Sequence, residues 1–306
     1  MGDFFANLGK MFSGEEPAAA PEGSTPVDVT DGAPAPISSA KGLNVTAEQI
    51  EGFAPDEVIA VLKAAISTSA GGTPAQNTAV IETCCKRLRV LCREPENCKK
   101  CDEAGTASAV VASMKALPSV PSVQLQALAA LVNLCSGEAN EHRKNAVEAG
   151  SMTAIVEAMT ALPKNAEVSS PPPQHALVQS SLFSLRQLSP SAVLLCAHVQ
   201  VQEMACIALQ NCCYGEDTHA LTRRQEAGAA GAIEAVVAAT KEHAESAPML
   251  DVGAATLRLI VHKVSALKTR AIKAGAKEEW VKPIAQGGGI LSFRKIGFGT
   301  SRRNRD

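Results

Sequence analysis

The residues of this chain that could do chemistry are first of all its cysteines. Cys98 and Cys101 have the two-residue spacing of paired zinc ligands, and Cys84, Cys85 and Cys92 precede them. Two adjacent cysteines on one helix, however, cannot both point at one metal ion, and no second cysteine pair or histidine pair with ligand spacing follows. We therefore expect these side chains to serve packing, with no metal site and no cofactor.

Histidine and glycine patterns give no catalytic motif either. The six histidines are scattered, and their spacing matches no grouping with Ser, Cys or Asp that would make an activated nucleophile. His142 and His219 fall at the starts of expected short helices, where we expect them to be solvated. Gly287-Gly288-Gly289 lacks the Lys-Ser or Lys-Thr that follows in a phosphate-binding loop. The chain is therefore predicted not to be an enzyme and to take no small-molecule substrate.

An Ala-Gly pair recurs between the predicted helices that position these residues. Ala149-Gly150 stands between a short basic helix and an apolar one. We expect the chain to turn there, because glycine takes a left-handed backbone conformation without steric cost. The same corner recurs at Ala104-Gly105, Ala230-Gly231 and Ala274-Gly275, each time after basic residues. Successive corner glycines are 45, 81 and 44 residues apart. The pattern indicates a helical repeat with one anomalous interval.

A second recurring pattern is a helix that ends in Ala-Leu-x-Asn. Residues 130–135 read ALVNLC and residues 208–213 read ALQNCC, with a weaker copy at residues 256–259. With the corner helix N/H-R-x-x-x-x-E-A-G, this pattern resembles the armadillo-repeat family over roughly residues 56–285, and the usual period of such arrays is about 40–47 residues. The resemblance implies an all-α, right-handed α-solenoid of about four armadillo-like three-helix repeats.

Periodicity also predicts individual helices. A short helix capped at Thr46 comes first, and the repeat domain is expected over residues 46–285. Further helices are expected at residues 56–66, 75–92, 95–103, 106–117 and 121–136, followed by a unit over about 217–261 and a terminal partial unit over 264–274 and 278–284.

The composition suits thin stacked helices better than a wide core. Apolar residues make up 46% of the chain but aromatic residues only 3%, so the units must pack with small and aliphatic side chains. Cys92, Cys135 and Cys213 share one register and are expected to be buried residues of a reduced protein. No apolar run approaches the roughly 18–20 residues of a membrane span. We expect an intracellular, cytoplasmic protein, with nuclear or membrane-peripheral locations as alternatives.

The anomalous interval contains an excess of 33 residues. From the corner glycine Gly105 to Asn133 there are 28 residues. Removing residues 169–201 joins Val168 to Gln202 without a break in the pattern and gives the same spacing of 28 residues from Gly150 to Asn211. The only charged residue of the removed stretch is Arg186, although 20% of the whole chain is charged. We expect residues 169–201 to loop out between two helices. The stretch is either a retained intron or gene-model error, or a functional loop.

Both ends of the chain differ from the repeat domain. Residues 1–12 form an amphipathic helix that suits a membrane surface or a partner's groove; docking on the solenoid and disorder are the alternatives. Residues 13–45 form an acidic Pro/Ala-rich linker, expected to be disordered. Residues 286–306 form a Gly-rich and then basic tail that could bind anionic lipid, RNA or an acidic protein. The candidate anchor residues are Phe4, Phe5, Leu8, Met11 and Phe12, and the basic-tail residues are Arg294, Lys295, Arg302, Arg303 and Arg305.

The family resemblance also implies a function. In armadillo proteins the third helices line a concave groove, where a ladder of Asn side chains can hold the backbone of an extended peptide. The chain is therefore expected to be a non-catalytic protein–protein interaction scaffold. The alternative is that each Asn only makes a hydrogen bond inside its own repeat. The expected groove residues are Asn133, Asn211, Gln126, Gln210 and Arg258.

The aromatic residues of one branch of the family are missing here. Ala129, Ile207 and Ala255 stand four residues before the Asn positions, where the nuclear-import branch has Trp, so recognition of nuclear localisation signals is not expected. Two other function classes stay open. One is a peripheral membrane adaptor held by residues 1–12 and the basic tail. The other, less favoured because the net charge is only −2, is a nucleic-acid-associated protein that uses the tail and the basic first helices.

Overall fold

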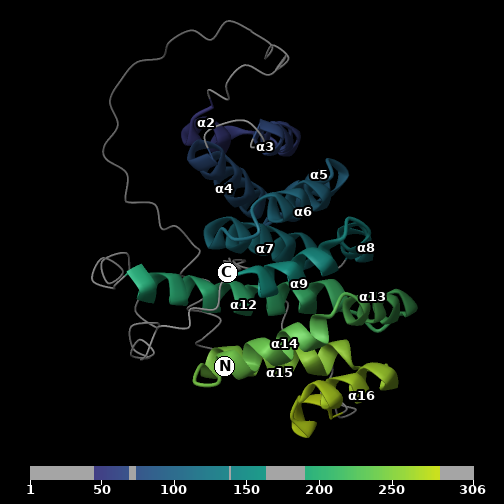
Figure 1. Ribbon diagram of the computed structural model, residues 1–306. Helices are drawn as coiled ribbons and strands as arrows, with labels where there is room; N and C mark the ends of the chain where they lie inside the picture. Colours follow the sequence, from purple (N-terminus) through teal and green to yellow (C-terminus); the bar gives the residue numbers. More distant parts are fainter. Residues whose placement is uncertain (1–44, 69–73, 138, 163–189, 283–306) are drawn as a thin grey trace, which may run out of the picture.

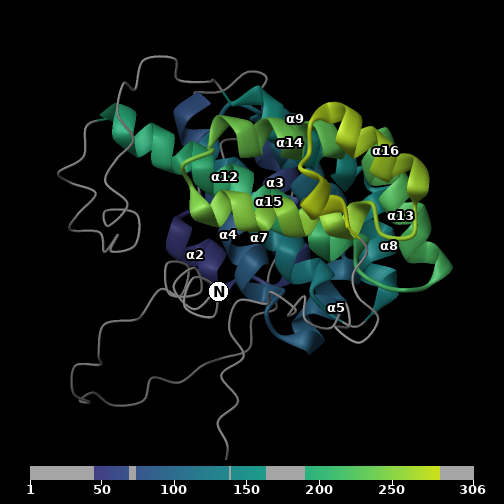
Figure 2. The same ribbon diagram turned by 90° about the horizontal axis from the view of Figure 1, so that it is seen from below.

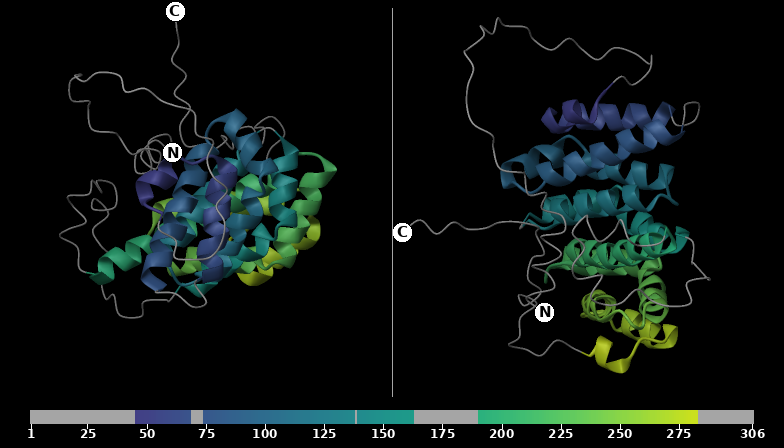
Figure 3. Two further views of the ribbon diagram at one scale, coloured as in Figure 1. Left: turned by 90° about the horizontal axis from the view of Figure 1, so that it is seen from above. Right: turned by 90° about the vertical axis from the view of Figure 1, so that its left-hand side faces the viewer.

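The computed structural model describes residues 45–68, 74–137, 139–162 and 190–282. Every regular element in these ranges is a helix, and the helices pile up in layers from α2 at one end to η1 at the other (Figure 1). A side view shows the same layers as a regular stack (Figure 3). The prediction of an all-α solenoid is confirmed.

The helices group into three-helix units. The first unit consists of α2 (Ala47–Gly52), α3 (Pro55–Thr68) and α4 (Pro74–Leu91), and Thr46 and Gln49 form the expected capping box. The bounds predicted for the next unit agree with the structure to within one residue. The remaining elements are α5 (Pro95–Glu103), α6 (Thr106–Ala116), α7 (Pro121–Cys135), α8 (Asn140–Glu148), α9 (Ser151–Ala161), α12 (Pro190–Cys213), α13 (Thr218–Ala229), α14 (Ala232–Glu242), α15 (Ala247–Ile260), α16 (Ser265–Ala274) and the 3-10 helix η1 (Glu278–Val281).

The four corner glycines all have a left-handed backbone. Gly105, Gly150 and Gly231 have φ values of 84°, 86° and 90° and precede α6, α9 and α14, and Gly275 ends α16 with a φ of 100°. A residue with a Cβ atom would lose about 1–2 kcal/mol in this conformation. The predicted turning points of the solenoid are therefore confirmed.

Helices of the same kind lie in columns when the stack is viewed along its length (Figure 2). The first helices of the units are α5, α8, α13 and α16, the second are α6, α9 and α14, and the third are α4, α7, α12 and α15. One hydrophobic core runs through all of the units, from Ile50 to Val281. Small residues such as Ala129 and Ala130 are fully buried, which lets the helix backbones approach closely.

Helix α12 differs from the prediction. It begins at Pro190 and has 24 residues, against 15 for α7, so residues 190–201 are helical instead of forming part of a loop. Proline suits the first turn of a helix, and the apolar sequence after it continues in register into the core, where Val201 is fully buried. Residues 163–189 lie outside the described residues.

The partial unit at the end of the described chain closes with the 3-10 helix η1 over residues 278–281. The last two residues of the predicted segment 278–284 lie outside the described residues. None of the helices in the described ranges has both the length and the apolar character required to cross a membrane.

Candidate binding surface on the third helices

The two Asn residues of the expected ladder connect neighbouring third helices. Asn133 donates from Nδ2 to the carbonyl oxygen of Arg89 at 2.8 Å, and Asn211 donates in the same way to Val132 at 2.9 Å. Both acceptors lie in the last turn of the preceding third helix, where carbonyl groups have no partner within the helix. The expected alternative of a bond inside the same repeat is therefore wrong, because the acceptor belongs to the neighbouring unit.

The other expected groove residues have different environments. Gln210 is buried, and its side-chain amide donates to Thr256 Oγ1 at 2.9 Å and to the Val252 carbonyl at 3.3 Å, so it also holds the stack together. Gln126 on α7 is partly exposed, and its Oε1 atom has no hydrogen-bond partner. Arg258 on α15 is partly exposed as well. Gln126 and Arg258 are therefore the predicted residues that remain available to a partner.

Glu203 on α12 adds an acidic group to this set. Its side chain is 7% exposed, and burial raises the pKa of its carboxyl group to about 7. Within the described residues it makes no hydrogen bond and no ion pair. Glu203 lies eight residues before Asn211, at the register that Leu125 occupies before Asn133. Sequence reasoning missed it, although a single acidic residue in an otherwise apolar helix was a usable signal.

Two buried arginines of the first helices hold the ends of the third helices. Arg143 and Arg224 each lie seven residues before their corner glycine, and burial lowers the pKa of both. Arg143 donates to the carbonyls of Asn211 and Gly137, and Arg224 donates to those of His262 and Gly215. Each guanidinium thus bridges the ends of two successive third helices. A positive charge is favourable there because the helix dipole is negative at its C-terminus.

These contacts bear on the alternative that the basic first helices bind nucleic acid. Arg223 is also buried and donates to the Cys212 and Tyr214 carbonyls, both at 2.7 Å. Arg143, Arg223 and Arg224 are therefore committed to backbone carbonyls and are not exposed to phosphate groups. The nucleic-acid alternative consequently rests on the basic tail and on exposed lysines such as Lys144.

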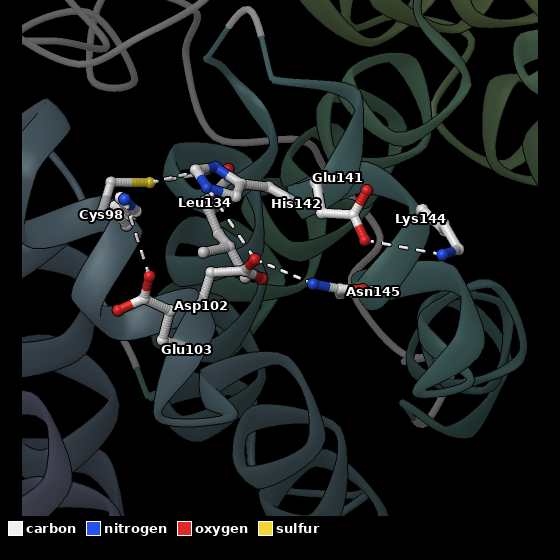
Figure 4. Close-up of polar contacts among 9 residues, drawn as sticks. Cys98, Asp102, Glu103, Leu134, Glu141, His142, Lys144 and Asn145 are labelled. Atoms are coloured by element: carbon white, nitrogen blue, oxygen red, sulfur yellow. Dashed lines mark hydrogen bonds and ion pairs between the residues drawn. The ribbon is translucent and has the colours of Figure 1, made fainter.

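Two successive first helices, α5 and α8, meet along a row of polar contacts (Figure 4). His142 lies between Cys98 and Asp102: its Nδ1 atom is 3.6 Å from the Cys98 sulfur, and its Nε2 atom is 3.8 Å from Asp102 Oδ2. Asn145 donates to the same carboxylate oxygen at 2.8 Å. The expectation that His142 is solvated is wrong, because its side chain is only 13% exposed, whereas His219 is exposed.

This Cys–His–Asp arrangement could not be found by spacing, since Cys98 and His142 are 44 residues apart. The Cys98 thiol is 5% exposed and also donates to the Leu134 carbonyl at 3.7 Å. A nearby thiol, Cys92, lowers the pKa of Cys98 by hydrogen bonding. The buried thiol therefore contacts α7 and α8 from its position on α5. Arg143 and Arg224 connect helices of later units in a similar way.

The cysteines pack as predicted. Nine of them are free and buried, among them Cys92, Cys135 and Cys213. Burial raises the pKa of the Cys213 thiol well above its ordinary value, and the Cys135 and Cys212 sulfurs lie 3.8 Å apart across two units. Cys98 and Cys101 both contact Cys92. These thiols fill space between closely packed helices.

The proposed anchor and tail residues lie outside the described residues. This applies to Phe4, Phe5, Leu8, Met11, Phe12, Arg294, Lys295, Arg302, Arg303 and Arg305. The membrane-adaptor alternative therefore stays a prediction.

The repeated unit described above defines the class of protein. Two short helices joined by a left-handed glycine, followed by a longer third helix that hydrogen-bonds to the preceding third helix, make an armadillo-like helical repeat array. No protein-family model and no curated protein matches the chain. Two solved structures are similar in fold. A designed armadillo repeat protein in complex with the peptide (KR)4 is 18% identical, with 75% of this chain and 79% of that chain covered and a TM-score of 0.46. An engineered protein is 19% identical, with 76% and 81% covered and a TM-score of 0.48.

Proposed function

We propose that this protein is a non-catalytic scaffold that binds an extended segment of another protein along its third helices. The observation that carries the proposal is a pair of unpartnered hydrogen-bond acceptors on adjacent third helices. Gln126 Oε1 on α7 is buried without a hydrogen-bond partner, and Glu203 on α12 is a buried residue whose carboxyl pKa is raised by burial. A buried acceptor without a donor costs about 1–3 kcal/mol, and a bound segment can recover this free energy.

The chemistry of these acceptors defines the partner segment. Gln126 accepts a neutral donor such as a backbone N–H group, whereas the Glu203 carboxylate favours a Lys or Arg side chain. Arg258, one helix further along the stack, favours an acidic or C-terminal carboxylate group. The segment proposed is therefore extended and polar, with a basic residue opposite α12. Burial and lost conformational freedom would determine how tightly it binds.

Site-specific photo-crosslinking tests this proposal. A photoreactive amino acid is placed at Gln126 or Arg258 in the full chain, and crosslinked proteins from cells are identified by mass spectrometry. We expect both positions to capture the same segment. The control position is Gln225, which is exposed on first helix α13. Crosslinks to one protein from Gln225 but not from the third-helix positions would place the binding surface elsewhere.

A synthetic peptide of the captured segment then tests the chemistry. We expect Glu203→Gln to weaken its binding at least about tenfold, because the variant removes the charge but keeps the shape. Replacing Glu226, an exposed acid on α13, by Gln is the matched control and should leave the dissociation constant unchanged. Equal affinities of the two variants would contradict the assignment of Glu203.

A further inference from the structure

A cluster of three potential metal ligands lies between the third helix α12 and the second helix α14. His198, Glu242 and His243 each offer one ligand atom, and these atoms all lie within 4.8 Å of one another. The two imidazole rings are 5.3 Å apart between centroids and nearly perpendicular, at 78°. His198 comes from the extended first half of α12, which projects beyond the neighbouring third helices (Figure 1), and the other two end α14.

An unpartnered buried nitrogen points to a missing ligand. His243 is 9% exposed, and its Nε2 atom is buried without a hydrogen-bond partner. Its backbone N–H group already donates to Ala239, so the ring is held at the end of α14 by its own helix. A buried polar atom without a partner is rare enough in a folded protein to require an explanation. A cation bound to this nitrogen would provide one.

The surroundings favour a positive ion. The site lies at the C-terminus of α14, where the helix dipole is negative. The His198 ring is also fixed in place, because Gln202 lies 3.1 Å from its Nε2 atom and donates to the Met159 carbonyl. The exposed Glu242 side chain leaves a path from solvent.

We propose that His198, Glu242 and His243 form a binding site for a divalent transition metal ion such as Zn²⁺. Two imidazoles and one carboxylate are a ligand set that zinc takes, with water in the fourth position. Bonds of about 2.0–2.2 Å require ligand atoms closer together than 4.8 Å, so the three side chains would move toward the ion when it binds. The ion would fasten the extended half of α12 to the second helix of the next unit.

Cobalt titration of the full-length protein tests the site. The protein is purified with a chelator under reducing conditions, and Co²⁺ is added while the visible spectrum is recorded. We expect one equivalent to bind and to give ligand-field absorption without a thiolate charge-transfer band, since nitrogen and oxygen atoms are the ligands. We also expect Zn²⁺ to displace Co²⁺ and to raise the melting temperature.

Two ligand variants and one control variant decide whether these residues are the ligands. Glu242→Gln changes an exposed side chain, so the variant should fold normally and bind Co²⁺ at least about tenfold more weakly. Glu245→Gln changes another exposed acid three residues further on and should bind as the wild type does. His243→Gln should abolish both the absorption and the thermal shift. A thiolate band, a stoichiometry of zero, or equal binding by the Glu242 and Glu245 variants would overturn the proposal.

Discussion

Asn211 donates its side-chain amide to the carbonyl of Val132, 79 residues earlier in the chain and one unit back in the stack. The bond satisfies a carbonyl that the last turn of α7 leaves without a partner. Asn133 does the same for Arg89 at the end of α4. The Asn position of this chain is therefore a structural connection between units, whatever else it contacts.

Replacing Asn211 by Ala should destabilise the protein by about 1–3 kcal/mol, because the Val132 carbonyl would stay buried without a donor. The free energy of unfolding from urea denaturation measures the effect. Gln225→Ala, on the exposed face of α13, is the control and should change stability by less than about 0.5 kcal/mol. Similar values for both variants would show that the Asn211 bond does not stabilise the stack.

Gly150→Ala should cost about 1–2 kcal/mol through the backbone alone. The space around a new Cβ atom is open, since its only neighbour within 4 Å is the flexible Lys115 Nζ atom at 3.9 Å, but the φ of 86° is unfavourable for alanine. Gly52→Ala is the matched control, because a Cβ atom there meets nothing within 4 Å and needs no left-handed backbone. Thermal denaturation should show a lower melting temperature for the first variant and an equal or higher one for the second.

Glu203 should make stability depend on pH. Its folded pKa of about 7 lies above its ordinary value of 4.5, so the folded state binds more protons between these two values. The contribution of Glu203 to stability is therefore fully present below pH 4.5, falls as the pH rises to about 7, and is constant above that. The loss is on the order of 3 kcal/mol.

The test is to compare Glu203→Gln with the wild type across this range. The variant should be the more stable protein at pH 8, and the difference between the two should shrink toward pH 4.5. Glu226→Gln controls for the removal of one exposed charge. A stability difference that does not change with pH would show that the carboxyl group of Glu203 is not buried.

The sequence predicted the architecture better than the contacts, for physical reasons. Corner glycines, helix starts and apolar periodicity are local signals, so the turns at Gly105, Gly150 and Gly231 could be located from spacing alone. Which polar atoms meet across units depends on how the units stack. The pairing of His142 with Cys98 and the burial of Arg143 were therefore not predictable from one chain. The helical part of the 169–201 stretch, residues 190–201, was missed because the spacing argument removed the whole stretch as a block.

Deleting residues 169–201 should leave the stack intact. The four residues 162–165 would then connect α9 to a shortened α12, as residues 117–120 connect α6 to α7. Val168 would take the buried position of Val201, and Asn165 would replace His198. We expect the deletion variant to keep its helical circular dichroism spectrum and a cooperative thermal transition, but to lose Co²⁺ binding. Loss of cooperative unfolding would show that residues 190–201 are required for the fold.

Peptide mapping decides whether the natural protein contains this stretch. A tryptic peptide that starts at Asn165 and runs from Val168 directly into Gln202 is expected if the stretch is a retained intron or gene-model error. Peptides from within residues 169–201 are expected if it is a functional segment, and the metal site could operate only in that form.

Several bonds between neighbouring units are donated toward the earlier unit, although Gln210 and Arg143 donate to carbonyls of later residues. Asn133, Asn211, Arg223 and Arg224 donate to carbonyls that come earlier in the chain. Each of these carbonyls therefore gains its donor only from residues made after it. During synthesis on the ribosome, a newly emerged unit would keep bare carbonyls at the end of its third helix until the next one folded against it, so the array should gain stability in steps as translation proceeds.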